Sequence, residues 1–427
     1  MNDRTVWMTW IIFAATYAGL ALGKVPGLRM DRAGIALVGA TLMLITGVLS
    51  LNQAVSPDSI DFKTLFLLFG MMIVVGVLRL SGFFELLVGL ALRRIRTPKG
   101  LLAVTIALSG GLSAFLINDV VCVALTPLVL HLARRMKFDP IPHLIGLATA
   151  ANVGSTGTIT GNPQNIYIGA HSGISYARFA ARLLPVALLG LGITYVVVCL
   201  VYRGRLTTPK GQQILDNDET PDEEGRGEGT PRSAGHARLQ IKAVVVTLAT
   251  VALFFTGLPL ELVALGAAAF VLLDRIKPQK VYRQVDWSLL TMFTGLFIVV
   301  HAFQVHVVAG WGIERWAWLL NRPTALLSLV SAALSNLVSN VPAVLLLEPV
   351  AQAVPTALRE TAWLALAMSS TFAGNLTVLG SVANLIVVET AARDGVVISF
   401  WEYCKVGIPL TVVTLLLGIA WLQFVHY

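Results

Sequence analysis

The sequence predicts an all-helical membrane protein made of two repeats that are inverted relative to each other. Hydrophobic residues make up 56% of the 427 positions and charged residues only 13%, with a mean hydropathy of +0.77. A soluble domain carries about 25% charged residues, so this chain could not cover its own surface in water. Its apolar residues come in blocks of 16 to 20, long enough to cross a hydrocarbon core of ~30 Å. Polar breaks that recur at matching places in both halves predict the repeats.

Composition also excludes several classes of protein. The net charge of +8 comes from basic residues in short loops between apolar blocks, a distribution that orients a membrane protein and argues against nucleic-acid binding. The three cysteines Cys122, Cys199 and Cys404 are far apart, so the chain has neither a disulfide framework nor metal-ligand spacing. We therefore expect no metal and no cofactor.

The apolar blocks follow the same order in each half. The first repeat, 1–204, has plain spans at 6–23, 33–50, 64–80 and 179–202, with broken stretches at 101–134 and 143–169. The second repeat, 239–427, has plain spans at 240–257, 259–274, 288–304 and 406–424, with broken stretches at 323–351 and 362–388. Between them, 205–238 is polar and rich in acidic residues, Gly and Pro, which predicts a disordered linker.

Polar, Gly and Pro positions recur in the same order in both halves, which indicates an internal duplication. Asp61 and Gly70 recur 225 positions later as Asp286 and Gly295. The remaining pairs are Ser113/Ser335, Asn118/Asn340 and Pro127/Pro349 at an offset of 222, and Gly161/Gly380 and Asn165/Asn384 at an offset of 219.

The charges of the loops predict the topology. Broken membrane helices survive only where protein or a water-filled cavity surrounds them, and paired breaks are typical of secondary transporters. If the first broken stretch of each half is a re-entrant hairpin, the chain has about 10 full spans, two hairpins and two broken helices. In that topology 24 of the 31 Lys and Arg residues lie inside and 7 outside. The positive-inside bias then predicts a multi-pass protein of the cytoplasmic (inner) membrane, with both termini outside and the linker in the cytoplasm.

The first hairpin carries Asn118-Asp119 in the middle of an apolar run. An Asp at a helix centre costs ~2.5–3.5 kcal/mol on insertion, so such a residue usually faces a cavity, an ion or a partner. The alternative is that the pair caps the helix that leaves the hairpin tip.

The first broken span is rich in residues that unwind a helix and offer neutral ligands. Gly and Pro break the helix, and hydroxyl and amide side chains supply oxygen atoms. An unwound segment also exposes backbone carbonyls and half-helix ends to a bound solute. The candidate ligands here are Asn152, Ser155, Thr156, Thr158, Asn162 and Asn165.

The second half offers a similar set without a counterpart of Asp119, because Val341 takes the aligned place. The candidate ligands are Ser339 and Asn340 at the hairpin tip and Asn375, Thr377, Ser381 and Asn384 in the broken span. Glu348 aligns with Thr126, so each hairpin has one carboxyl group that could carry a proton, since burial favours its neutral form. Alternatively, Glu348 lies near the outer interface without a role.

Two weaker candidates remain. His301 and His306 end a span, and we expect them at the membrane interface rather than on a proton path. None of the four polar motifs contains Lys or Arg, which favours a neutral, hydroxyl-rich substrate or a cation over an anion.

The motifs resemble the arsenite-permease branch of the ion transporter superfamily. The resemblance rests on Asn118-Asp119 with Leu125-Thr126-Pro127, on 151–155 and on 161–165, and it is nearest to arsenite efflux permeases and plant-type silicon-efflux transporters. It implies an inverted-repeat fold that exports arsenous, antimonous or silicic acid in exchange for protons, with the hairpin Asp as a proton carrier.

The same superfamily includes sodium-coupled dicarboxylate symporters and sodium/proton antiporters, which stay open as alternatives with Na⁺ as the coupling ion. A channel or an ATPase subunit is a third hypothesis, although the chain lacks a Gly-x-x-x-x-Gly-Lys-Ser/Thr nucleotide loop. The expected partners are a small inorganic solute and the lipid bilayer. A homodimer and an ATPase partner stay open.

Overall fold

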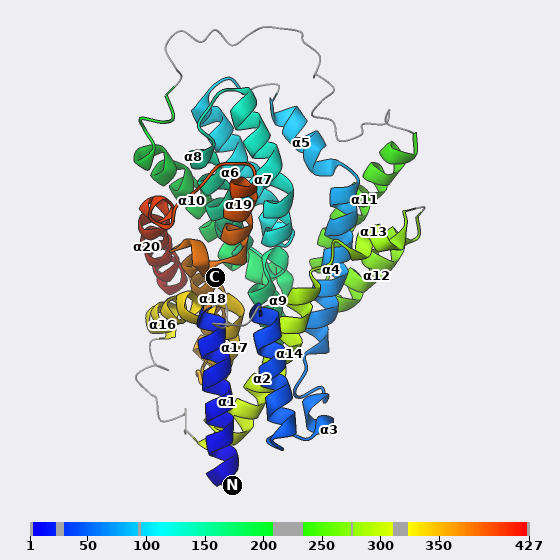
Figure 1. Ribbon diagram of the computed structural model, residues 1–427, viewed down its shortest axis with the longest axis vertical. Coiled ribbons are helices and arrows are strands. Elements are labelled where there is room, and N and C mark those ends of the chain that lie inside the picture. Colours follow the sequence, from blue (N-terminus) through cyan, green and yellow to red (C-terminus); the bar gives the residue numbers. More distant parts are fainter. Residues whose placement is uncertain are drawn as a thin grey trace.

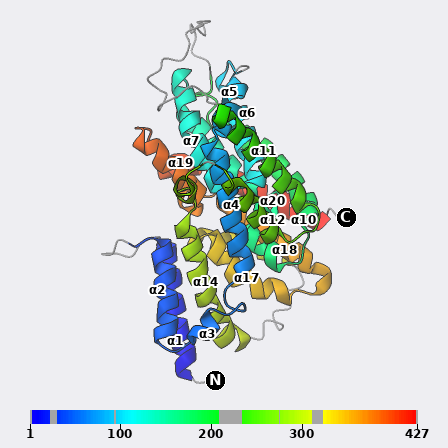
Figure 2. The same ribbon diagram turned by 90° about the vertical axis from the view of Figure 1, so that its right-hand side faces the viewer.

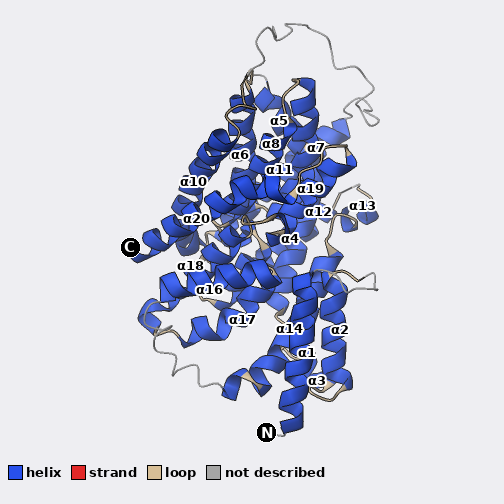
Figure 3. Cartoon of the chain, turned by 60° about the vertical axis from the view of Figure 1, so that its left-hand side comes forward, coloured by secondary structure: helices blue, strands red, loops and turns tan. Residues whose placement is uncertain are grey.

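The computed structural model describes residues 3–22, 30–92, 95–207, 234–274, 276–310 and 323–424. Every regular element within these ranges is a helix, as Figure 3 shows. Seven of the described helices are long and apolar enough to cross a membrane. The prediction of an all-helical membrane protein is thereby confirmed.

The helices follow the predicted order of blocks. The first half contains α1 (Asp3–Leu22), α2 (Arg32–Ile45), α3 (Leu51–Ala54), α4 (Phe62–Leu80), α5 (Phe83–Leu92), α6 (Pro98–Phe115), α7 (Asn118–Arg135), α8 (Pro140–Ser155), η1 (Ile159–Gly161), α9 (Pro163–His171) and α10 (Tyr176–Val201). The second half contains α11 (Ala234–Phe254), α12 (Leu260–Leu272), α13 (Pro278–Tyr282), α14 (Trp287–His306), η3 (Val308–Gly310), α16 (Pro323–Val338), α17 (Asn340–Ala353), α18 (Thr356–Ala373), η5 (Val378–Gly380), α19 (Val382–Arg393) and α20 (Phe400–Phe424).

Three boundaries differ from the expected ones. The span expected at 33–50 ends at Ile45, because Gly47 takes a left-handed turn with φ +73°. Helix α5 occupies a stretch that the charge pattern assigned to a loop, since its sequence is almost wholly apolar. Helix α11 begins at Ala234, inside the expected linker, whose residues 208–233 lie outside the described part of the chain.

The recurring Asp61 and Asp286 have the same local function. Asp61 is the N-cap of α4 and accepts a hydrogen bond from the Lys63 backbone N–H at 3.1 Å. Asp286 is the N-cap of α14 and accepts from the Leu289 backbone N–H at 2.9 Å. A carboxylate at this position satisfies an otherwise unpaired donor and complements the helix dipole.

Each first broken stretch forms two packed helices joined by a short break, α6 with α7 and α16 with α17. The first break lies at Leu116 and Ile117, and the second at Ser339. The two ends of the first hairpin lie close together. His143, near the beginning of α8 and shortly after α7, contacts the Pro98 carbonyl at the beginning of α6 through its Nε2 at 3.0 Å. Ser339 has φ +80°, a conformation that costs a non-Gly residue about 1–3 kcal/mol.

The two halves pack through corresponding pairs of helices. Helix α2 packs on α14, and α12 packs on α4. Within the halves, α6 packs on α8 and α16 on α18. Figures 1 and 2 show α1, α2 and α3 near one end of the long axis, with α5 to α8 toward the other and α9, α17 and α18 between them.

The recurring glycines Gly70 and Gly295 lie where the halves approach most closely. A Cβ on Gly70 would lie 2.7 Å from the backbone carbon of Ala264 in α12. A Cβ on Gly295 would lie 2.6 Å from the backbone carbon of Ala36 in α2. Small residues that allow such backbone contact are typical of helix interfaces in membranes, and here they join one half to the other.

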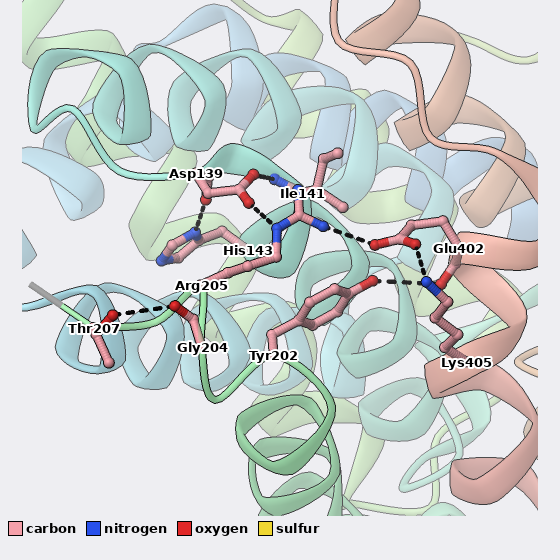
Figure 4. Close-up of polar contacts among 9 residues, drawn as sticks. All are labelled: Asp139, Ile141, His143, Tyr202, Gly204, Arg205, Thr207, Glu402 and Lys405. Carbon is pink, nitrogen blue, oxygen red and sulfur yellow. Dashed lines mark hydrogen bonds and ion pairs between the residues drawn. The ribbon is translucent and has the colours of Figure 1, made fainter. Parts of the chain in front are cut away.

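A polar network joins the ends of α8, α10 and α20 (Figure 4). Arg205 pairs with Asp139, the N-cap of α8, and its Nη1 donates to Glu402 Oε1 at 2.8 Å. Lys405 Nζ donates to Glu402 Oε2 at 2.7 Å. Burial raises the pKa of the Tyr202 phenol, so this hydroxyl stays a donor to the Glu402 carbonyl at 3.3 Å. The network ties the end of the first half to the last helix of the second.

We predict that Gly70→Ala and Gly295→Ala each lower the thermal unfolding temperature of the purified protein. The added methyl groups would push the helix backbones apart, and overpacking typically costs about 1–3 kcal/mol. Gly266→Ala, on α12 with no atom within 4 Å of the added Cβ, is the control and should unfold no earlier than the parent. Equal unfolding temperatures for Gly70→Ala and the parent would contradict this account of the interface.

Candidate functional site

Asn152 of α8 lies at the centre of a hydrogen-bond network that joins the two halves. Its Nδ2 donates to Asn375 Oδ1 at 2.9 Å and to Asn384 Oδ1 at 3.0 Å. Its Oδ1 accepts from Asn118 Nδ2 and from Ser381 Oγ, both at 3.0 Å. An amide side chain has two donors and two acceptor lone pairs, so the hydrogen-bonding capacity of Asn152 is fully used.

The two helix breaks carry the same hydrogen bonds in both halves. Asn165 Nδ2 donates to the backbone carbonyls of Ser155 at 3.1 Å and Thr158 at 3.0 Å. Asn384 Nδ2, 219 positions later, donates to the carbonyls of Gly374 at 2.7 Å and Thr377 at 3.1 Å, which themselves lie 219 positions after Ser155 and Thr158. Each amide satisfies carbonyls that the unwound helix leaves without partners.

A second set of bonds crosses between the halves. Asn162 Nδ2 donates to Thr371 Oγ1 at 3.2 Å, and Gln164 Nε2 donates to the same oxygen at 3.1 Å. Thr371 of α18 lies 219 positions after Asn152 of α8. These two corresponding helices therefore each receive hydrogen bonds from the break of the other half. Three other expected ligands bond to backbone carbonyls. The Ser155 and Thr156 hydroxyls donate to the Asn152 carbonyl beside their own break, and the Thr158 hydroxyl donates to the Ala114 carbonyl of α6.

The hairpin tips carry buried oxygen atoms without hydrogen-bond partners among the described residues. Asn118 Oδ1 and Asn340 Oδ1 form one repeat-related pair, and Ser113 Oγ and Ser335 Oγ form another. Asn336 Oδ1 and Asn165 Oδ1 are also unpaired. A buried acceptor without a partner costs about 1–3 kcal/mol, so these oxygens are the available ligands of the site.

Capping does not explain Asn118-Asp119. Ile117 occupies the N-cap of α7, and no side chain caps this helix. The Asn118 side chain instead reaches Asn152. Asp119 lies half-buried in the first turn of α7 and has no hydrogen-bond or ion-pair partner among the described residues, so its carboxyl group is free to bind a ligand or a proton.

The structure separates the two carboxyl groups that the sequence placed in the hairpins. Glu348 lies two turns along α17 from the tip and is buried, with only 7% of its surface exposed. Its partners are Tyr167 Oη and Gln352 Nε2, the latter at 2.8 Å. Glu348 therefore belongs to a different environment from that of Asp119 and the helix breaks.

The sequence motifs did not identify two residues of the site, Arg32 and Thr371. Arg32 Nη1 donates to Ser339 Oγ at 3.4 Å and brings a positive charge to the second hairpin tip. No motif could predict this contact, because 307 positions separate the two residues. Thr371 was also missed, although the repeat offset of 219 from Asn152 contained the signal.

Comparison with known proteins relates this site to transporters. Residues 8–373 match the model of the citrate transporter family, CitMHS. The chain is 32% identical to the silicon efflux transporter LSI3 of Oryza sativa subsp. japonica, with 97% of each chain covered. It is 24% identical to the candidate transporter arsB of Dictyostelium discoideum, over 97% of this chain and 90% of that protein.

A solved structure has the same fold. The Alcanivorax borkumensis YdaH transporter matches with a TM-score of 0.58 at 14% identity, over 98% of this chain and 96% of that chain. The protein is therefore a multi-pass membrane transporter and not an enzyme, and it belongs to the citrate transporter family, within the arsenite-permease branch of the ion transporter superfamily.

Proposed function

We propose that the protein exports a small neutral metalloid hydroxide, such as arsenous or silicic acid, in exchange for protons. The observation that carries this proposal is the set of buried, unpaired acceptor oxygens at the two hairpin tips. A polyhydroxide supplies several O–H donors at once, and each could satisfy one of these acceptors. The similarity to a silicon efflux transporter supports the direction of transport.

Asp119 is the proposed proton carrier. Its carboxylate would accept hydrogen bonds from the hydroxide, whereas its protonated form would become a donor and change which ligand the tip favours. The N-terminus of α7 stabilises the charged form, and the carboxyl group has no hydrogen-bond or ion-pair partner among the described residues. A proton on this group therefore displaces no protein contact.

The proposal includes the topology that the loop charges predict. Lys99 at the beginning of α6 and Arg134, Arg135 and Lys137 at the end of α7 favour the cytoplasm for both feet of the first hairpin. The protein would then lie in the inner membrane with both termini outside and 205–238 in the cytoplasm. Its partners would be the solute and the bilayer, with no cofactor. A homodimer and an ATPase partner remain expectations from the resemblance.

We predict that Asp119→Asn keeps substrate binding but abolishes proton-driven transport. The amide preserves the size and polarity of the side chain but cannot carry a proton at ordinary pH. Purified protein in liposomes that hold a pH-sensitive dye would receive arsenous or silicic acid under an imposed proton gradient, without sodium.

The matched control is Asp394→Asn, which removes an exposed carboxylate at the end of α19 and should leave the substrate-dependent proton flux unchanged. Proton-coupled transport by Asp119→Asn at the rate of the parent would refute the assignment of the carrier.

A sodium-coupled anion symporter, or a sodium/proton antiporter, is the second candidate function. Oxygen ligands at unwound helices also suit Na⁺, and Arg32 at the second tip could pair with an anion. The match to the citrate transporter family is in line with this alternative.

Arg32→Gln distinguishes the two functions. If the substrate is an anion, we predict that its affinity falls by roughly tenfold or more, because a charge-assisted hydrogen bond contributes about 1.5–3 kcal/mol. If the substrate is a neutral hydroxide, the variant should transport it nearly as well as the parent. The measurement is uptake of citrate with sodium, and of arsenous or silicic acid without it, into the same liposomes.

A further inference from the structure

A polar cavity lies apart from the helix breaks. It is bordered by the region before α4, the end of α9, and helices α14 and α17. Its volume is about 280 Å³, which is room for several water molecules at about 30 Å³ each. The titratable side chains that line it are Asp58, Asp61, Tyr167, His171, His301 and Glu348. His301, which the sequence predicts at the membrane interface, is one of these lining residues.

Glu348 is held in place by donors rather than by a cation. Tyr167 Oη donates to its Oε2, and Gln352 Nε2 donates to its Oε1 at 2.8 Å. Of the described residues that line the cavity, none is Lys or Arg, and no described cation forms an ion pair with Glu348. The Glu348 carboxylate is therefore oriented by neutral donors and has no fixed counter-charge among the described residues.

The opposite wall of the cavity carries a histidine–carboxylate pair and unpaired oxygen atoms. His171 Nδ1 lies 3.6 Å from Asp61 Oδ2 and 3.0 Å from the Tyr167 carbonyl, and its ring packs on the Tyr167 ring at 4.1 Å between centroids. Asp61 Oδ2 is buried without a hydrogen-bond partner. Ser59 is only 6% exposed, and its Oγ, also unpaired, lines the cavity. These unpaired oxygens border a cavity that is large enough for ordered water to satisfy them.

Other charged or titratable groups near Glu348 lie on the elements that pack against α17. Asp58 and Asp61 precede α4, His301 lies on α14, and Tyr17 of α1 donates to the Pro342 carbonyl at 3.1 Å. Arg32 and Arg359 contact the two ends of α17 through Ser339 and the Val354 carbonyl but do not line the cavity. Because the described lining contains three carboxyl groups and neither Lys nor Arg, the cavity attracts protons and cations.

The cluster combines residues of both halves, and its key members have no titratable counterpart at the repeat-related positions. Glu348 aligns with Thr126, whose Oγ1 donates to the Cys122 carbonyl at 2.6 Å in an ordinary helical contact. Tyr167 and His171 align with Ile386 and Thr390 at the offset of 219. The helix breaks have the same hydrogen bonds in both halves, whereas these titratable residues form no second cluster in the described part of the chain. This difference indicates a function on one side of the membrane only.

We propose that this cavity is an outward-facing proton-loading site, in which Glu348 receives a proton from external water by way of the His171–Asp61 pair. The proposal rests on the proposed proton exchange and on the predicted topology, which puts the region before α4 and the end of α9 outside. The proton adds to the Glu348 carboxylate and later leaves the same group as the transporter changes state. Tyr167 is a positioning residue that orients this carboxylate.

The first test uses labelling with dicyclohexylcarbodiimide, which modifies buried protonated carboxyl groups. Parent protein in liposomes should be labelled at Glu348, as read by peptide mass spectrometry, and labelling should fall as the external pH rises. Tyr167→Phe should change this pH dependence. Absence of label on Glu348 at low external pH, in protein that is folded, would overturn the proposal. This readout does not require that any substrate be transported.

The second test measures substrate-dependent proton flux while only the external pH is varied. Glu348→Gln should lose most of the dependence on external pH but should retain substrate exchange. Glu360→Gln removes a more exposed carboxylate that pairs with Arg178 at 2.7 Å, and should behave as the parent. Parent-like dependence in Glu348→Gln would overturn the loading site and leave the proposed function intact. If the parent shows no proton flux with any metalloid hydroxide, the proposed function fails, and labelling of Glu348 alone then decides the site.

Discussion

The structure depends on the amide of Asn152, which holds together elements from both halves at the helix breaks. Its four hydrogen bonds reach the first hairpin tip through Asn118 and the second break through Asn375, Ser381 and Asn384. Unwound backbone inside a membrane is tolerated only where protein or water satisfies it. The network around Asn152 provides hydrogen-bond partners of this kind from the protein itself. A side chain of another size or with fewer donors would leave several of these groups unpaired at once, because bonds in such a network support one another.

In the described conformation, Asn152 and the hairpin tips differ in the hydrogen-bonding capacity that they have left. Asn152 has no hydrogen-bonding capacity left, whereas the hairpin tips carry unpaired oxygens in repeat-related pairs. A solute that binds at the tips satisfies acceptors that are already desolvated and does not compete with the bonds of Asn152. The strained backbone of Ser339 lies at one of these tips, and strain of this kind is typical of segments that change conformation during function. The bonds that join the halves and the groups that we propose to bind the solute are thus carried by different residues.

Much of this arrangement could be predicted from the duplication in the sequence. The recurrence of Asp61, Gly70 and Asn165 has a common cause in each case, namely a helix cap, a close helix crossing and an amide that satisfies an unwound segment. Contacts that join segments distant in the sequence could not be predicted in this way. The side chain of Arg32 reaches the second hairpin tip only because α2 packs on α14 across the repeat boundary, and periodicity carries no information on such a pairing. The role of Asn152 was also only half predicted: the residue type indicated a ligand, but its partners show that it holds the site together.

Symmetry also determines where a coupling ion can act. If two inverted halves were chemically identical, the inward-open and outward-open states would be related by a two-fold axis in the membrane plane, and neither side could be favoured by the protein itself. A preference for one direction must then come from residues without a counterpart in the other half, together with the gradients across the membrane. Asp119 aligns with Val341, and Glu348 aligns with Thr126, so both carboxyl groups of the hairpins are departures from the repeat. They also lie in separate environments, one beside the helix breaks and one in the cavity beside α9. A proton bound at either group in only one of the two states would make those states unequal.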